Sequence, residues 1–247
     1  MGINMIEEAT DTIKNSNRMS AFTGAGISVE SGVPPFRGEN GLWSEHDPSK
    51  FRINYFKAHP EKSWQVIRDE FFSIFNEVEP NQAHKGLAQM EQNGFLNTII
   101  TQNIDNLHQE AGSEEVYEFH GNSRYLVCLK CGNRIPAESR EYQELPPKCE
   151  ECGGLLKPDF IFFGEPIPEL ARNKALEETK KSDLFLLIGT TGEVMPASRI
   201  PLLASQNGAT IIEINIQKSN FTDRITDIFL KGKATKMVQK LVDNLLR

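Results

Sequence analysis

Apolar residues recur along the chain in two alternating patterns. Short and nearly continuous apolar runs are typical of strands buried on both faces, whereas apolar residues three and four positions apart are typical of helices with one buried side. The first pattern predicts strands over residues 20–26, 96–101, 116–119, 158–164, 184–190 and 209–215. The second predicts helices over residues 5–15, 81–92, 104–112, 168–181, 196–208 and 233–246.

The alternation of strands and helices predicts the α/β class, with a doubly wound parallel sheet that helices cover on both faces. Ligands bind to such sheets beyond the carboxyl ends of the strands. The residues at these ends are small and polar, namely Gly24-Ala25-Gly26, Thr101-Gln102-Asn103, Gly189-Thr190-Thr191 and Asn215. The pattern therefore predicts a ligand site along this edge of the sheet.

Two segments interrupt the alternation. Residues 38–80 are rich in Trp and Phe and predict a helical insertion, whereas residues 124–157 lose all periodicity and contain the four cysteines of the chain. These cysteines form two C-x2-C pairs separated by 17 residues, a spacing typical of zinc sites. Four thiolates complete the tetrahedral shell of zinc and leave no position for water, so we expect a structural site. Four unrelated buried cysteines are the alternative.

Composition and charge narrow the class of protein. Of the 247 residues, 38% are hydrophobic and 25% charged, as in ordinary globular proteins. The net charge of −7 argues against a general nucleic-acid binder, and so do the balanced charges of residues 124–157. No apolar run reaches the roughly 20 residues that span a bilayer, and the acidic N-terminus is unlike a signal peptide. We expect a cytoplasmic protein with reduced thiols and without a nucleic-acid or membrane partner.

The stretch 24–38, GAGISVESGVPPFRG, is similar to the start of the dinucleotide fingerprint G-x-G-x-x-G. Val29 holds the place of the third glycine, which lets a helix pack closely on the sheet. Backbone N–H groups at Gly24 and Gly26 can approach a phosphate, although a plain tight turn accounts for them equally well. Arg37 could pair with a phosphate of the ligand, and Phe36 could cover a ring of the ligand. The alternative is that Arg37 is an ordinary surface arginine and Phe36 a core residue.

Two further features point to chemistry at the same edge. Residues 102–106, QNIDN, place four polar side chains where a strand ends and a helix begins. An N-cap needs only one of them, so the others are candidates to bind an amide and a ribose. His120 follows the predicted strand 116–119 and is the candidate general base, since histidine titrates near neutral pH. For His108, a packing role is favoured.

The motifs GAGISVESGVPPFRG, TQNIDNLH, FHGN, KPDFIFFGE, GTTGEVMPAS and EIN, with the two cysteine pairs, stand in the order found in sirtuins. The chain resembles this family of NAD-dependent protein-lysine deacylases from about Ala21 to the C-terminal helix. The resemblance implies a Rossmann-like NAD-binding domain made of residues 1–37, 81–123 and 158–247. It also implies a small domain that combines the four-cysteine zinc ribbon, 124–157, with the helical insertion, 38–80.

The resemblance assigns roles to individual residues. It implies that His120 and Asn103 are catalytic, with His120 as the general base. The implied NAD-binding residues are Gly24, Ala25, Gly26, Phe36, Arg37, Gln102, Asn103, Ile104, Asp105, Gly189, Thr190, Thr191, Asn215 and Ile216. The implied substrate-binding residues are Ile161, Phe162, Phe163, Gly164, Glu165, Gly192, Glu193 and Val194. The implied zinc ligands are Cys128, Cys131, Cys149 and Cys152.

The implied reaction transfers an acyl group from lysine to ADP-ribose and releases nicotinamide. NAD is then a co-substrate, and the partner is an acyl-lysine protein or peptide. The sequence does not determine the oligomeric state, and we expect a monomer. Pro35 stands where many members carry an acidic residue, and the Tyr-x-x-Arg pair of succinyl-preferring members is missing near residues 67–70. We therefore expect neutral acyl groups, acetyl or longer.

Three other functions are left open by the sequence. The same site could transfer ADP-ribose to protein or hydrolyse NAD. A non-catalytic zinc-ribbon protein would leave His120 and the polar cluster 102–106 unexplained. A dehydrogenase should carry the third glycine and an acidic residue after a second strand, and Asp47, at about the right distance, lies in the aromatic insertion instead.

Overall fold

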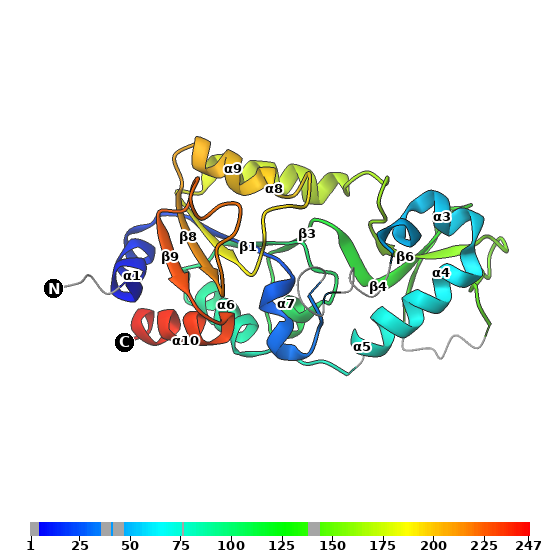
Figure 1. Ribbon diagram of the computed structural model, residues 1–247, viewed down its shortest axis with the longest axis horizontal. Coiled ribbons are helices and arrows are strands. Elements are labelled where there is room, and N and C mark those ends of the chain that lie inside the picture. The colour runs from blue at the N-terminus through cyan, green and yellow to red at the C-terminus, as the bar shows by residue number, and fades with distance from the viewer. Residues whose placement is uncertain (1–4, 36–40, 42–46, 76, 138–143) are drawn as a thin grey trace.

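The computed structural model describes residues 5–35, 41, 47–75, 77–137 and 144–247. A large sheet with its helices lies at one end of the molecule, and a smaller sheet with α3 and α4 lies at the other (Figure 1). Within the described ranges, no helix is long and apolar enough to cross a membrane.

The large sheet has six strands in the order β3-β2-β1-β7-β8-β9, and every neighbouring pair is parallel. The strands are β1 (Met19–Thr23), β2 (Thr98–Thr101), β3 (Val116–Glu118), β7 (Leu184–Ile188), β8 (Thr210–Asn215) and β9 (Ile228–Lys231). The chain builds outward from β1 to β3, returns to the other side of β1 and builds outward again. The strand order therefore reverses between β1 and β7, which is the Rossmann-like arrangement, and the predicted α/β fold is confirmed.

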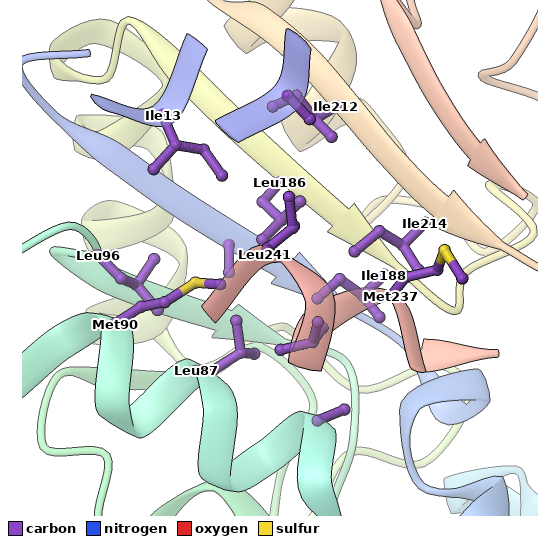
Figure 2. Packing of buried hydrophobic residues seen from close by; sticks show 14 of the residues in the cluster. Ile13, Leu87, Met90, Leu96, Leu186, Ile188, Ile212, Ile214, Met237 and Leu241 are labelled. Carbon is purple, nitrogen blue, oxygen red and sulfur yellow. The ribbon is translucent and has the colours of Figure 1, made fainter. Parts of the chain in front are cut away.

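Helices cover both faces of this sheet, as the apolar strands predict. One face is covered by α1 (Met5–Asn15), α6 (Gln82–Gln92) and α10 (Ala234–Leu245), and the other by α8 (Glu169–Lys181) and α9 (Arg199–Gln206). Side chains of β7 alternate between the two: Leu186 packs on the first face and Phe185 on the second. Figure 2 shows Leu186 among side chains from the first set of helices, including Leu87 and Leu241.

The smaller sheet is antiparallel and packs against the helical insertion. Its order is β5-β4-β6, with β4 (Gly121–Cys128), β5 (Arg134–Pro136) and β6 (Leu156–Phe160). The insertion comprises a 3-10 turn (Pro48–Phe51), α3 (Ile53–Ala58), α4 (Pro60–Ile67), a π-helical turn (Arg68–Phe72) and α5 (Ser73–Phe75). Trp64 joins the two, because its ring is fully buried and its Nε1–H donates to the carbonyl of Leu156 at 2.9 Å. The helical character predicted for residues 38–80 is confirmed where the structure describes them.

Three local features differ from the sequence prediction. The strand expected over 158–164 is β6, which begins at Leu156, ends at Phe160 and pairs antiparallel with β4. The helix expected over 104–112 is only α7 (Leu107–Glu110), because Asn106 has a left-handed φ of 68°, which a helix cannot continue. Strands β4, β5 and β9 were not predicted, since buried β4 positions include polar residues such as Ser123, and β5 and β9 have only three and four residues.

The glycine loop after β1 packs backbone to backbone on the loop after β7. Gly26 N–H donates to the carbonyl of Gly189 at 2.9 Å, and Gly24 N–H donates to that of Ile188 at 3.0 Å. A Cβ at Gly26 would lie 2.6 Å from the Cα of Gly189, and Gly189 itself has a φ of +62°. Val29, at the place of the third glycine, is 44% exposed in a short 3-10 helix (Val29–Ser31). Close packing therefore requires glycine at positions 26 and 189, where the strand order reverses. At position 29 a side chain is accommodated because it points to solvent.

We expect Gly189→Ala to lower the free energy of unfolding by roughly 2–5 kcal/mol. Left-handed backbone costs about 1–2 kcal/mol for a non-glycine residue, and overpacking against Gly26 adds about 1–3 kcal/mol. Gly208→Ala is the matched control, because Gly208 has a φ of +92° but no described atom lies within 4 Å of the place that a Cβ would take. Guanidinium unfolding of both variants measures the difference. Equal losses would contradict a packing role for Gly189.

Candidate functional site

His120 lies between β3 and β4, at the carboxyl edge of the large sheet. The turn after it is sharp, because Gly121 has a φ of +73° and a Cβ there would overlap the carbonyl oxygen of Asp159. The Nδ1 atom of His120 lies 3.0 Å from the carbonyl oxygen of Gln102. Since a carbonyl only accepts hydrogen bonds, Nδ1 carries the proton and Nε2 keeps a lone pair.

The electrostatic setting of His120 suits a base. Burial lowers the pKa of the imidazole, and the hydrogen bond to Gln102 offsets part of that effect. A lowered pKa keeps the ring neutral at neutral pH, so that Nε2 can accept a proton. His120 therefore lies where the sequence predicts it, at the end of a strand and in contact with the polar cluster 102–106 through the carbonyl of Gln102.

Asn103, Ser28 and Asp105 form a buried hydrogen-bonded group beside the glycine loop. Asn103 Nδ2 donates to Ser28 Oγ at 3.0 Å, and Ser28 Oγ–H donates to Asp105 Oδ2 at 2.6 Å. The other Asp105 oxygen accepts from the N–H of Leu107 at 3.1 Å. Burial raises the pKa of Asp105, and these hydrogen bonds oppose the rise. The group fixes both the Asn103 amide and the Asp105 carboxyl in orientation.

His84 completes this group from α6. Asn81 N–H donates to His84 Nδ1 at 3.3 Å, so the proton of the neutral ring is on Nε2, which lies 3.3 Å from Ser28 Oγ. Ser28 thus accepts from His84 and Asn103 while it donates to Asp105. Sequence reasoning missed both Ser28 and His84. The available signal was weak: a serine in a glycine loop and a histidine three residues after the Asn81 N-cap.

A cleft of about 310 Å³ opens beside these groups. This volume includes open solvent at the mouth of the cleft. It is lined by Ala25, Val33, Pro34, Glu70, Phe71, Phe75, Asn103, Ile104 and Asp105. The structure thereby brings four predicted NAD-binding residues together. Glu70, Phe71 and Phe75 come from the helical insertion, and the sequence offered no reason to place them there.

Asn103 offers this cleft an unused acceptor. Its side chain is only 4% exposed, and Oδ1 has no hydrogen-bond partner among the residues that the structure describes. A buried polar atom without a partner is costly, so a ligand that donates a hydrogen bond would stabilise this position. An amide or a sugar hydroxyl has the required chemistry.

The remaining predicted NAD-binding residues extend along the same edge. Gln102 Nε2 donates to Thr190 Oγ1 at 3.0 Å, and Asn215 Nδ2 donates to the carbonyl of Thr190 at 3.0 Å. These bonds connect the ends of β2, β7 and β8. Thr191 and Ile216 are exposed beside them. Phe36 and Arg37 lie outside the described residues.

The predicted substrate-binding residues form two segments with different exposure. Phe163 is 42% exposed, whereas Phe162 is buried against Phe56. Glu193 is exposed, and Gly192 packs closely on the ring of Phe221 with a φ of +74°. The remaining members of the two segments are Ile161, Gly164, Glu165 and Val194.

The four cysteines converge on one point of the smaller sheet. Their Sγ atoms all lie within 4.8 Å of one another, with 3.5 Å between Cys128 and Cys152 and 3.8 Å between Cys131 and Cys149. A tetrahedral zinc with bonds of about 2.3 Å requires sulfur separations of about 3.8 Å, so the cluster has the right size. Backbone N–H groups of Cys131 and Lys130 lower the pKa of the Cys128 thiol, whereas the nearby Cys152 and Cys128 sulfurs raise the pKa of the Cys131 thiol. Gly154 leaves room for the cluster, because a Cβ there would lie 2.7 Å from the Cys128 sulfur.

Comparison with known proteins identifies relatives over nearly the whole chain. A family model described as the Sir2 family matches residues 24–196. An NAD-dependent protein deacetylase 1 from Pyrobaculum aerophilum is 41% identical over 97% of this chain and 94% of its own. An NAD-dependent protein deacylase from Pyrococcus furiosus is 40% identical over 98% and 99%. A solved Sir2 structure with a p53 peptide and NAD+ is 31% identical, with a TM-score of 0.89 over 96% of this chain and 97% of its own.

We expect His84→Gln to reduce the loss of stability in acid. Burial lowers the pKa of His84 from 6.5 to about 4, so below pH 6.5 the unfolded chain binds a proton that the folded chain does not. The stability penalty is absent above about pH 6.5, grows as the pH falls and levels off near pH 4. At pH 5 it is about 2 kcal/mol.

Denaturant unfolding at pH 7 and pH 5 measures this effect. The wild type should lose more stability between the two values than His84→Gln, which has no imidazole to protonate. His59→Gln is the control, because His59 is exposed, and it should keep the wild-type difference. The same acid loss in His84→Gln as in the wild type would refute the assignment.

Proposed function

The chain belongs to the Sir2 family, and on this basis we propose that it is an NAD-dependent protein deacylase. It transfers the acyl group of a modified lysine to ADP-ribose and releases nicotinamide. The observation that carries the proposal is that the same sheet edge holds both a neutral His120, whose Nε2 keeps its lone pair, and a buried Asn103, whose side-chain oxygen has no partner among the described residues.

The residues at the cleft fit one end of NAD. Asn103 Oδ1 lacks a donor among the described residues, and Asp105 presents a carboxyl that Ser28 holds in place. When bound, NAD supplies a ribose carbon that becomes electrophilic as nicotinamide leaves. Asp105 and the fixed amide of Asn103 would then face the developing positive charge, and a preorganised group of this kind stabilises such charge. Phe71 and Phe75 help to exclude water from the cleft.

His120 accepts a proton from a ribose hydroxyl in this proposal. The bond from Nδ1 to the Gln102 carbonyl holds the ring in one tautomer and keeps Nε2 as the base. Thr190, Thr191, Asn215 and Ile216 are proposed to bind the phosphates and adenosine, since they follow the strand ends at the same edge. That Phe36 and Arg37 belong to a loop that covers bound NAD stays a prediction.

The acyl-lysine substrate is proposed to bind along Ile161–Glu165 and Gly192–Val194. The exposed ring of Phe163 and the exposed Glu193 support this proposal, as does the peptide in the related structure. An extended peptide between such segments would pair through its backbone, so its sequence would matter little. Neutral acyl groups are proposed because the Tyr-x-x-Arg pair is missing.

We also propose that the cysteine cluster holds one structural zinc, with four thiolates and no open position for water. A location in the cytoplasm would keep these thiols reduced. The two-domain division at residues 37/38, 80/81, 123/124 and 157/158 is likewise a proposal. We propose that the protein is a monomer, and we propose no nucleic-acid partner.

Incubation with NAD and an acetyl-lysine peptide should release nicotinamide only when the peptide is present. Mass analysis should find acylated ADP-ribose and the intact peptide with an unmodified lysine. Finding ADP-ribosylated peptide, or free ADP-ribose alone, would overturn the proposed reaction. We expect His120→Ala to lower kcat by about 10²–10⁴-fold with its zinc retained, because the base is lost. His59→Ala should keep the wild-type rate. Full activity of His120→Ala would refute the base assignment.

Metal analysis should find about one zinc per chain, as expected for a site with four cysteine ligands. Cys149→Ser should lose it, and the melting temperature should fall by roughly 10 °C, because the free energy of metal binding contributes to folding. Chelation should lower the melting temperature of the wild type by a similar amount. Added zinc should then restore the melting temperature of the wild type but not raise that of Cys149→Ser. Unchanged metal content in Cys149→Ser would contradict the site.

A further inference from the structure

Lys157 is a buried lysine outside the site described above. It lies on β6 and is only 4% exposed. Its ammonium group is fully engaged: Nζ donates to the carbonyls of Pro158 and Phe160, each at 2.7 Å, and lies 3.1 Å from Glu165 Oε2. The ammonium also lies 4.7 Å from the centre of the Phe162 ring, a cation–π contact.

Glu165 closes the other side of this contact. The Oε2 atom that faces Lys157 also accepts the N–H of Phe162 at 2.8 Å, and Glu165 N–H donates to the carbonyl of Phe162 at 3.0 Å. The ion pair therefore joins Lys157, on β6, to Glu165, at the end of the loop Ile161–Glu165 that follows the strand. We call Lys157, Glu165 and the enclosed residues the β6 clasp.

The β6 clasp is attached to two other parts of the molecule. Ile161 N–H donates to the carbonyl of His120 at 2.8 Å. On the other side, Phe163 N–H donates to the carbonyl of Phe51 at 2.9 Å, and Ile53 N–H donates to that of Phe163 at 3.1 Å. The loop thus connects the backbone of the candidate base with the helical insertion.

The ion pair is largely buried, with 5% of the Lys157 side chain and 19% of the Glu165 side chain exposed, and such a pair is a poor way to gain stability. Burial lowers the pKa of Lys157 while Glu165 raises it, so the environment opposes the charge that the partner supports. Well-packed apolar residues of similar volume are often equally stabilising, whereas loss of one partner leaves a buried charge. What an apolar pair could not provide is directed hydrogen bonding to the carbonyls of Pro158 and Phe160 and to the N–H of Phe162.

We propose that Lys157 and Glu165 are positioning residues: their ion pair holds Ile161–Phe163 in the shape that sets the backbone of His120 and presents Phe163 to the acyl-lysine. Neither side chain takes part in the chemistry. The inference rests on the proposed function, because it assigns a role in peptide use. It goes beyond the resemblance, which implied substrate contact by Glu165, since the Glu165 carboxylate is turned inward to Lys157 and Phe162.

Three variants of the full chain separate positioning from stability. Lys157→Met keeps the aliphatic stem and leaves Glu165 unpaired; Glu165→Gln keeps an acceptor for Phe162; the double variant removes both charges. The matched control is Lys181→Met with Glu177→Gln. That pair has the same residue types 3.4 Å apart, but both side chains are about half exposed on α8.

Steady-state deacylation and thermal melting are measured for each variant. We expect Lys157→Met to melt lower than the wild type and the double variant to recover much of that loss. Peptide KM should nevertheless stay raised by roughly tenfold or more in the double variant, because the reacting groups are misplaced. KM for NAD should change by no more than about twofold, and the control pair should match the wild type. A double variant with wild-type peptide KM and kcat would overturn the proposal.

Hydrogen exchange tests the β6 clasp without the proposed activity. Amides of Ile161 and Phe163 should exchange faster in the double variant than in the wild type, and at the wild-type rate in the control pair. Unchanged protection would overturn the clasp whatever the enzyme does. A wild type that deacylates no peptide would instead overturn the proposed function, and the exchange result would still decide whether the ion pair holds this segment.

Discussion

The close approach of Gly26 and Gly189 is the contact on which the site depends. It brings the loop after β1 against the loop after β7, at the point where the strand order reverses. A side chain on either residue would push the loops apart, because the clash would be with backbone atoms that have no rotamer to change. The carboxyl edge of the sheet, where NAD is proposed to bind, is continuous because these loops meet: Ala25 lies on one side of the contact and Thr190 on the other.

A second constraint is that the polar groups of the site are buried and must satisfy one another. Ser28 accepts from His84 and Asn103 and donates to Asp105, so its hydroxyl is saturated. The Asn103 amide is consequently anchored through its nitrogen, and its oxygen has no partner among the residues that the structure describes. Low dielectric makes each of these bonds stronger and each unmade bond costlier, which favours one fixed arrangement. The same burial keeps the nearby imidazoles neutral.

The smaller sheet and the helical insertion act on the site through the chain that joins them. Residues 160–163 pass from β6 past the backbone of His120 to the 3-10 turn at Phe51. The insertion also supplies Phe71 and Phe75 to the cleft from its π-helical turn and α5. The four cysteine sulfurs converge at the far end of this sheet. The proposed zinc and the aromatic packing would thereby both support the geometry around His120.

Sequence analysis predicted the parts of the fold whose physical signals are local or periodic. Buried strands, amphipathic helices and the paired cysteines carry their own signals, and motif order pointed to His120, Asn103 and Asp105. It did not predict β4, β5, β9 or the ends of β6, because their pairing depends on partners distant in the chain. Nor did it point to Ser28, His84, Glu70 or Lys157, since a serine, histidine, glutamate or lysine is ordinary in sequence. Only the tertiary structure decided their roles, because burial and the atoms around a polar group determine what it can bind and which charge it keeps.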